Sequence, residues 1–187
     1  MILGTLKTLW FLVLVSAPPA FSGNEARTTI AQPRERSTLT GAANVGETAP
    51  AFELQRIDGR TVSLTDLRGN PAVLIFWTSW CSFCKAEAPA FNRLAHRYRA
   101  KGVRVLGINI QDSEKRTREG IKDFGIRYMV ARDADATVAQ RYHVISTPTV
   151  IFLDAQGVIT YRGNRLPEDY HQRFETLMQS GRKSQVE

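Results

Sequence analysis

The sequence predicts an α/β domain in which a central mixed sheet is flanked by helices. Short apolar runs alternate with stretches of helical periodicity in the middle of the chain, and two further strand-like runs follow them. The chain has 187 residues, of which 43% are hydrophobic, enough for one domain with a substantial core. No internal repeat interrupts this pattern, so a single sheet with helices on both faces is expected.

The charge of the chain is strongly basic, with 25 Lys and Arg against 18 Asp and Glu, a formal net charge of +7. Such a balance is compatible with binding to nucleic acid or to a membrane surface. However, the sequence contains no run of five or more basic residues, and charges of both signs alternate along its helical stretches. This pattern is typical of a solvated surface, and we expect no nucleic-acid partner.

Residues 1–22 have the pattern of an export signal. Lys7 precedes an apolar run from Leu9 to Val15, and Ala20 and Ser22 supply the small residues that suit cleavage after Ser22. The apolar run is short for a membrane-spanning helix, which needs about 20 residues, but an uncleaved anchor is the alternative. We therefore expect the protein in the periplasm or another extracytoplasmic compartment.

The rest of the chain divides by composition. Polar residues without apolar periodicity predict a flexible linker, and the apolar patterns of a folded domain begin at about Val45. The expected segments are a linker at 23–44, a domain at 45–181 and a tail at 182–187.

The domain is predicted to begin with a β-hairpin. Residues 51–54 alternate between apolar and polar, Asp58-Gly59 is a turn signal, and residues 60–64 supply the second strand. A short helical turn is expected next, with Thr65 as its cap and Gly69 at its end.

A wholly apolar run at 72–77 predicts the buried central strand, and the helix after it is expected to run to about Ala100. Helix starts, turns and apolar runs predict the later elements in the same way. These are a strand at 103–110, a helix capped by Asp112 or Ser113 and ending at Phe124, a short strand at 128–130, a helix capped by Asp133 or Asp135, a hairpin of 149–153 with 158–162, and a last helix with Pro167 in its first turn.

Both cysteines of the chain, Cys81 and Cys84, lie where the central strand passes into the following helix. Unpaired backbone N–H groups and the helix dipole favour an anion there, and the thiolate is the reactive form of cysteine. A purely structural bridge over so short a loop would constrain little of the unfolded chain. A zinc site needs four ligands, and the histidines show no matching spacing. A redox pair is therefore favoured.

The surroundings of the pair resemble the thioredoxin superfamily, and within it the TlpA/ResA-like thiol–disulfide reductases of bacterial envelopes. The matching pattern is Trp-x-x-Trp-Cys-x-x-Cys-x-x-Glu-x-Pro at residues 77–89, followed by Ser-Thr-Pro-Thr at 146–149. The resemblance covers about residues 45–180. It implies a thioredoxin fold with an N-terminal β-hairpin and a central strand–helix insertion around 103–131.

This resemblance implies a role for each cysteine and for the later proline. Cys81, at the helix start and partly exposed, is the expected nucleophile, and Cys84 the resolving thiol that forms a disulfide with it. Thr147-Pro148 is expected to form a cis peptide facing the pair, with backbone groups of Thr147 free to bind an extended substrate.

Glu87 is a candidate proton acceptor for the thiols. Ile75 stands where thioredoxin carries a buried acid, and ResA-like proteins place a glutamate at the position of Glu87; the simpler alternative is a solvated first-turn carboxylate. Trp80 and Phe83 are expected to form substrate-contacting surface beside the thiols. Many relatives carry proline where this chain has Phe83, so the direction of electron flow stays open.

The expected function is an exported thiol–disulfide oxidoreductase that acts as a reductant and needs neither a metal nor an organic cofactor. The resemblance implies substrates such as apocytochrome c or a copper-delivery protein, with electrons from a membrane thiol transporter. One alternative is a copper-binding module using Cys81, Cys84 and His143. Another is a peroxiredoxin-type peroxidase, whose motif Thr78 fits but whose proline is replaced by Leu74.

Overall fold

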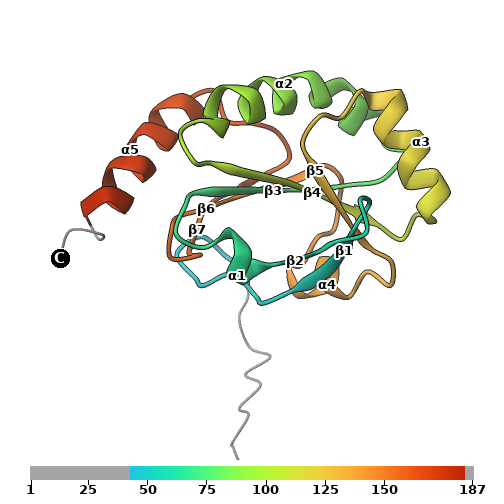
Figure 1. Ribbon diagram of the computed structural model, residues 1–187, viewed down its shortest axis with the longest axis horizontal. Coiled ribbons are helices and arrows are strands. Elements are labelled where there is room, and N and C mark those ends of the chain that lie inside the picture. Colours follow the sequence, from blue (N-terminus) through green and yellow to red (C-terminus); the bar gives the residue numbers. More distant parts are fainter. Residues whose placement is uncertain (1–42, 184–187) are drawn as a thin grey trace, which may run out of the picture. The chain divides into compact units, whose positions relative to one another are not determined.

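The computed structural model describes residues 43–183, with side chains described to residue 180. Within this part of the chain, seven strands form one sheet and five helices pack against it (Figure 1). The strands are β1 (Glu53–Arg56), β2 (Thr61–Ser63), β3 (Ala72–Trp77), β4 (Arg104–Ile110), β5 (Met129–Asp133), β6 (Thr149–Leu153) and β7 (Ile159–Gly163). The helices are α1 (Leu64–Leu67), α2 (Ser82–Arg99), α3 (Glu114–Phe124), α4 (Thr137–Arg141) and α5 (Tyr170–Lys183).

The strand order across the sheet is β2-β1-β5-β4-β3-β6-β7, so β3 is interior and carries the cysteines from the middle of the sheet. β3 pairs in parallel with β4 and antiparallel with β6, and all six of its residues are buried. Both faces of β3 are covered by helices, so its side chains are apolar throughout and do not alternate between apolar and polar residues.

Helices cover both faces of the sheet, as the sequence predicts. On one side α2, α3 and α5 lie together, and on the other α1 and α4 (Figure 1). Successive β3 residues serve the two cores in turn, Leu74 and Phe76 on the α1–α4 side and Val73 and Ile75 on the α2–α5 side. Because side chains on both faces of β3 are buried, the position of this strand is fixed, and so is the start of α2.

Several element ends differ from the expected ones. α1 is capped by Ser63 rather than Thr65, because Ser63 and Asp66 form a reciprocal capping box. α5 begins at Tyr170, so Pro167 lies in the turn before it, where its carbonyl accepts from the Tyr170 N–H. Pro89 lies inside α2 without ending it.

The boundaries of the domain also shift slightly. Ala43 and Asn44, expected to end the linker, belong to the described part, and Ala43 is buried. α5 continues to Lys183, two residues into the expected tail. The expected signal segment 1–22 and most of the linker lie outside the described residues. Among the helices within 43–183, none has the length and apolar character needed to cross a membrane.

Candidate active site

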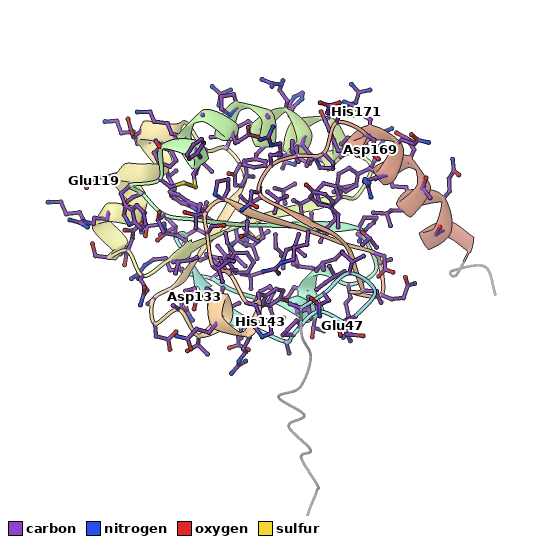
Figure 2. All side chains as sticks on the ribbon, turned by 180° about the vertical axis from the view of Figure 1, so that it is seen from behind. Glu47, Glu119, Asp133, His143, Asp169 and His171 are labelled. Carbon is purple, nitrogen blue, oxygen red and sulfur yellow. A yellow bond between two sulfur atoms is a disulfide. The ribbon has the colours of Figure 1, made fainter. Side chains whose placement is uncertain are left out.

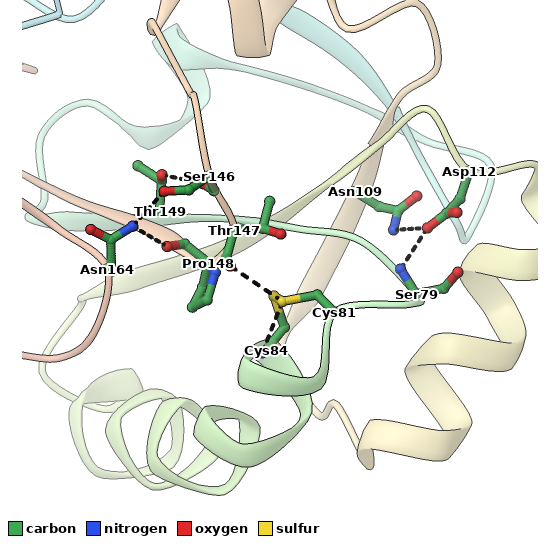
Figure 3. Close-up of a disulfide and its surroundings, with 10 residues drawn as sticks. All are labelled: Ser79, Cys81, Cys84, Asn109, Asp112, Ser146, Thr147, Pro148, Thr149 and Asn164. Atoms are coloured by element: carbon green, nitrogen blue, oxygen red, sulfur yellow. Dashed lines mark hydrogen bonds between the residues drawn. A yellow bond between two sulfur atoms is a disulfide. The ribbon is translucent and has the colours of Figure 1, made fainter.

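The two cysteines form a disulfide at the junction of β3 and α2. A turn joins the two elements, and across it the Cys81 N–H donates to the carbonyl of Thr78 (3.2 Å). Cys81 is the N-cap residue of α2, and its sulfur accepts a hydrogen bond from the N–H of Cys84 (3.0 Å; Figure 3). In the reduced protein this position stabilises a thiolate on Cys81, because the N–H groups of the first turn lack partners within the helix.

Cys81 is buried more deeply than the sequence predicts. It is 6% exposed and Cys84 is 3% exposed, so Cys81 is the more accessible of the two by a small margin. The carbonyl oxygen of Thr147 lies 3.4 Å from the Cys81 sulfur, although the two residues are 66 positions apart. The sulfur of a disulfide carries no hydrogen, so this contact becomes a hydrogen bond when Cys81 is a thiol.

The loop that carries Thr147 faces the disulfide, and its Thr147–Pro148 peptide bond is cis (Figure 3). Asn164 holds the loop by donating from Nδ2 to the hydroxyl of Ser146 (2.8 Å) and to the carbonyl of Pro148 (3.0 Å). The hydroxyl of Thr149 donates to the carbonyl of Ser146 (2.7 Å). Sequence reasoning missed Asn164, because an asparagine after a closing hairpin has no local feature that distinguishes it from a turn residue.

Large apolar side chains are exposed around the disulfide. Trp80 and Phe83 are each 74% exposed, and Ile145, two residues before Thr147, is 96% exposed. Exposed apolar side chains close together are typical of a surface that contacts a partner. The sequence singled out the first two but not Ile145, although an isoleucine outside any strand or helix pattern was a usable signal.

A cleft of about 380 Å³ opens beside Trp80. Its walls are the turn before α2, the corner between β4 and α3, and the segment 144–147. Thr78 lines it, and the buried hydroxyl of this residue has no hydrogen-bond partner among the described residues. The cleft therefore offers a substrate an apolar wall next to the reactive pair.

Glu87 lies one turn after Cys84 on α2, half-buried, with no hydrogen bond or ion pair to any described residue. Ile75 is buried in an apolar cluster with Phe91 and Leu94, and so places no ionisable group beneath the disulfide. Glu87 is thus an unpaired carboxylate close in sequence to the resolving thiol. Its role in proton transfer stays a prediction.

The structure does not bring His143 to the cysteines. Figure 2 shows His143 on the side of the sheet where α4 lies, away from the disulfide. Within residues 43–183, no group of three or more His, Cys, Asp or Glu side chains is placed to hold a metal ion. In the described part of the chain, no His, Asp or Glu side chain therefore joins Cys81 and Cys84 as the copper-binding hypothesis requires.

Comparison with known proteins identifies the same region. Residues 45–162 match the model of the AhpC/TSA family. The thiol-disulfide oxidoreductase ResA of Geobacillus thermodenitrificans is 33% identical over 138 residues, which cover 73% of this chain and 79% of the relative.

Solved structures agree with this match. The thioredoxin domain of a thiol-disulfide oxidoreductase from Bacteroides vulgatus superposes with a TM-score of 0.66 at 24% identity, covering 72% of this chain and 98% of that one, and it shows the fold. A secreted disulfide oxidoreductase of Mycobacterium tuberculosis, described as homologous to Escherichia coli DsbE, superposes with a TM-score of 0.57. It is 27% identical, with 67% of this chain and 93% of that one covered.

Proposed function

The chain belongs to the AhpC/TSA family and is a thiol–disulfide oxidoreductase of the ResA and DsbE type, and from this premise we propose that it reduces protein disulfides outside the cytoplasm. The observation that carries the proposal is the Cys81–Cys84 disulfide at the start of α2, facing the carbonyl of Thr147. The Cys81 sulfur, which caps α2, lies beside the Thr147 carbonyl, and this carbonyl can accept a hydrogen bond from the backbone of an extended substrate.

The proposed reaction has two steps. The Cys81 thiolate attacks one sulfur of the substrate disulfide, whose S–S bond breaks, and the other substrate sulfur leaves as a thiolate. Cys84, after losing its proton, then attacks the Cys81 sulfur and releases the second substrate thiolate. Two electrons pass from the enzyme dithiol to the substrate, which takes up two protons, and the Cys81–Cys84 disulfide is formed.

The partners follow from this chemistry and from the family resemblance. The substrate class is an exported protein with a disulfide, such as apocytochrome c in cytochrome c maturation or a copper-delivery protein. A membrane thiol transporter would return two electrons to the disulfide after each turnover. The signal pattern of residues 1–22 supports an extracytoplasmic location, as does the description of the Mycobacterium relative as secreted.

The direction of electron flow is tested by the redox potential of the cysteine pair. A reductant of structural disulfides should equilibrate with glutathione at a potential well below about −150 mV, towards the value of thioredoxin. The measurement is the fraction of reduced protein across a series of glutathione buffers. A potential above that limit, near those of strongly oxidising catalysts, would overturn the proposal that the protein is a reductant.

The order of attack and the substrate are tested by trapping. Cys84→Ala should accumulate a mixed disulfide between Cys81 and its substrate in the native envelope, because the second step is blocked. Cys81→Ala should trap nothing and serves as the matched control. Identification of the trapped protein names the substrate, and trapping by Cys81→Ala instead would reverse the roles of the two cysteines.

A peroxidase is the second candidate, and one observation favours it: Thr78, three residues before Cys81, lines the cleft, and its buried hydroxyl has no hydrogen-bond partner among the described residues. Against it, the position of the peroxiredoxin proline is held by Leu74, which is fully buried in β3. The two functions separate in one assay. Consumption of hydrogen peroxide with dithiothreitol as electron donor should not exceed that of Cys81→Ala, and consumption well above this control would favour the peroxidase.

A further inference from the structure

The turn that leads into Cys81 is held from outside by a buried carboxylate. Within the turn Thr78–Cys81, the N–H of Ser79 has no partner in β3 or α2. It donates instead to Oδ2 of Asp112 (2.7 Å), which lies 33 residues further along the chain (Figure 3). Asp112 is 5% exposed and stands at the corner between β4 and α3. One hydrogen bond therefore connects this corner to the backbone two residues before the nucleophile.

Asp112 is itself fixed by two buried polar side chains. Asn109, at 1% exposure, donates from Nδ2 to the same carboxylate oxygen (2.9 Å). The hydroxyl of Thr117, fully buried on α3, lies 2.8 Å from Oδ1 of Asn109. Because an ionised carboxylate only accepts, the amide nitrogen of Asn109 faces Asp112 and its oxygen faces the Thr117 hydroxyl, which also lies 3.0 Å from the carbonyl of Ser113. The three side chains form a chain of hydrogen bonds from Thr117 on α3, through Asn109 on β4, to Asp112 and the turn.

The backbone bends to bring Asp112 into place. Gln111, the residue before it, has a φ of 56°, in the left-handed region that costs a residue with a side chain of order 1 kcal/mol. Its N–H donates to the carbonyl of Asp133 (2.9 Å), which anchors the bend to the end of β5. An unfavourable conformation is therefore maintained at the position that aims Asp112 at the turn.

Helix α3 also packs directly against the same turn. A Cβ atom on Gly120 would lie 2.9 Å from the ring of Trp77, closer than real Cβ contacts come, and 3.0 Å from Cβ of Ser79, which is tighter than most. The glycine lets the helix approach the last residue of β3 and the turn that follows. The α3 region thus contacts Ser79 twice, through a side-chain packing contact and through the carboxylate of Asp112.

We propose that Asp112 is a positioning residue for Cys81, and that Asn109 and Thr117 hold Asp112 in that role. The hydrogen bond to Ser79 fixes the turn, and the turn fixes where the Cys81 sulfur lies relative to the Cys84 N–H and the Thr147 carbonyl. The strand–helix segment after β4 thereby contributes to thiol reactivity without touching a reacting atom. The inference concerns exchange at Cys81 in either direction, so it does not depend on the protein being a reductant.

The test compares Asp112→Ala with Asp112→Asn in the reduced protein. Alanine removes the acceptor, and the rate at which Cys81 is alkylated by iodoacetamide at neutral pH should fall about tenfold. Asparagine keeps an oxygen acceptor without the charge. The alkylation rate of Asp112→Asn should therefore stay within about twofold of the wild-type rate. If the two variants slow equally, or both react faster, the effect belongs to the charge and the positioning role is overturned.

The matched control is Asp133→Ala, since Asp133 is another buried aspartate that accepts two backbone N–H groups, those of Val138 and Ala139. It should lose stability without changing the alkylation rate. If Asp112→Ala fails to fold by circular dichroism, Thr117→Val provides the test, because it keeps the shape but frees the Asn109 amide. It should slow alkylation about threefold, in line with one weakened hydrogen bond. An unchanged rate in a folded variant would contradict the proposal.

Discussion

Cys81 has two functions in this structure: its sulfur caps α2 and forms one half of the disulfide. N-cap positions favour side chains whose oxygen accepts a hydrogen bond from the N2 or N3 backbone N–H. Here a sulfur accepts that bond from the N–H of Cys84, so the backbone group that would stabilise a thiolate is already in place. Reduction of the bond therefore does not require the helix start to be rebuilt.

The residues of the site were predictable to different degrees. Cys81 and Cys84 follow from spacing within one segment, because a single strand–helix junction places both, whereas the role of Glu87 on the same helix stays a prediction from the family resemblance. Asp112 and Asn164 were not identified as site residues, since each acts on backbone groups of a segment distant in sequence. Local patterns identify helix caps and turns, and they predicted Asp112 only as a possible cap of α3.

Glu87→Gln tests the proton acceptor at the residue scale. If the Glu87 carboxylate accepts the proton of Cys84 before the resolving step, its loss should slow release of the reduced substrate on the order of 10²-fold. The measurement is the decay of a mixed disulfide between Cys81 and a model peptide at neutral pH. Glu119→Gln, which removes an exposed acid on α3, is the control. Equal decay in the two variants would leave Glu87 as a solvated carboxylate.

At the scale of the elements, sequence patterns predicted the bounds of a uniformly buried strand well, but they predicted the cap residues at helix ends less well. β3 spans the six residues that its apolar run predicts. For α4, the sequence offered Asp133 or Asp135 as the cap, whereas the N-cap residue is Ala136, which has a left-handed backbone and no side-chain bond. Both aspartates still bind the first turn of the helix, Asp135 through the N–H of Thr137 and Asp133 through the next two N–H groups.

The burial of Asp133 predicts a dependence of stability on pH. Desolvation raises the pKa of this carboxyl above its ordinary value of 3.8, against the lowering effect of the N–H groups of Ala139 and Val138. The folded state then keeps the proton to a higher pH than the unfolded state does. The contribution of Asp133 is therefore present below pH 3.8 and is lost as the pH rises through the folded pKa.

The measurement is urea unfolding of the wild type and Asp133→Asn from about pH 4 to about pH 6. The free energy of unfolding of the wild type should fall relative to the variant, by at most about 1.4 kcal/mol per pH unit for one proton. Asp66→Asn is the control of opposite sign, because the backbone N–H and the hydroxyl of Ser63 lower the pKa of Asp66. Relative to that variant the wild type should gain stability as the pH rises through the folded pKa of Asp66 to 3.8, so this comparison runs from about pH 2 to about pH 4. A rise in both comparisons would mean that the N–H donors outweigh burial at Asp133.

At the scale of the whole described domain, the order of the strands in the sheet could not be predicted from sequence patterns. The hairpin β1–β2 joins the sheet beside β5, where Gln55 pairs with Arg132. Strand periodicity identifies which face of a strand is buried, but not which edge accepts it. The chosen pairing places β3 in the interior, so the cysteine pair extends from a strand with neighbours on both sides.

The first described residues protect the opposite edge of the sheet. Thr48 forms a bridge with Val158, and three backbone hydrogen bonds join this segment to the β7 side: Gly46 N–H to the Ile159 carbonyl (2.8 Å), Ala49 N–H to the Gly157 carbonyl (2.9 Å), and Ile159 N–H to the Glu47 carbonyl (2.9 Å). Arg162 on β7 also donates to the carbonyls of Ala43 and His143. An edge strand left without such cover is a template for association with other chains.

Comparing a chain of residues 43–187 with one of residues 50–187 tests this cover. Loss of three backbone hydrogen bonds at about 1 kcal/mol each should lower the free energy of unfolding by about 3 kcal/mol. The shorter chain should also associate, because the exposed N–H and carbonyl groups of β7 can pair between molecules. Urea unfolding and sedimentation velocity measure the two effects. The alkylation rate of Cys81 should be the same in both chains, since the removed segment has no described contact with the turn or the disulfide. Equal stability and a monomeric shorter chain would show that residues 43–49 lie on the sheet without stabilising it.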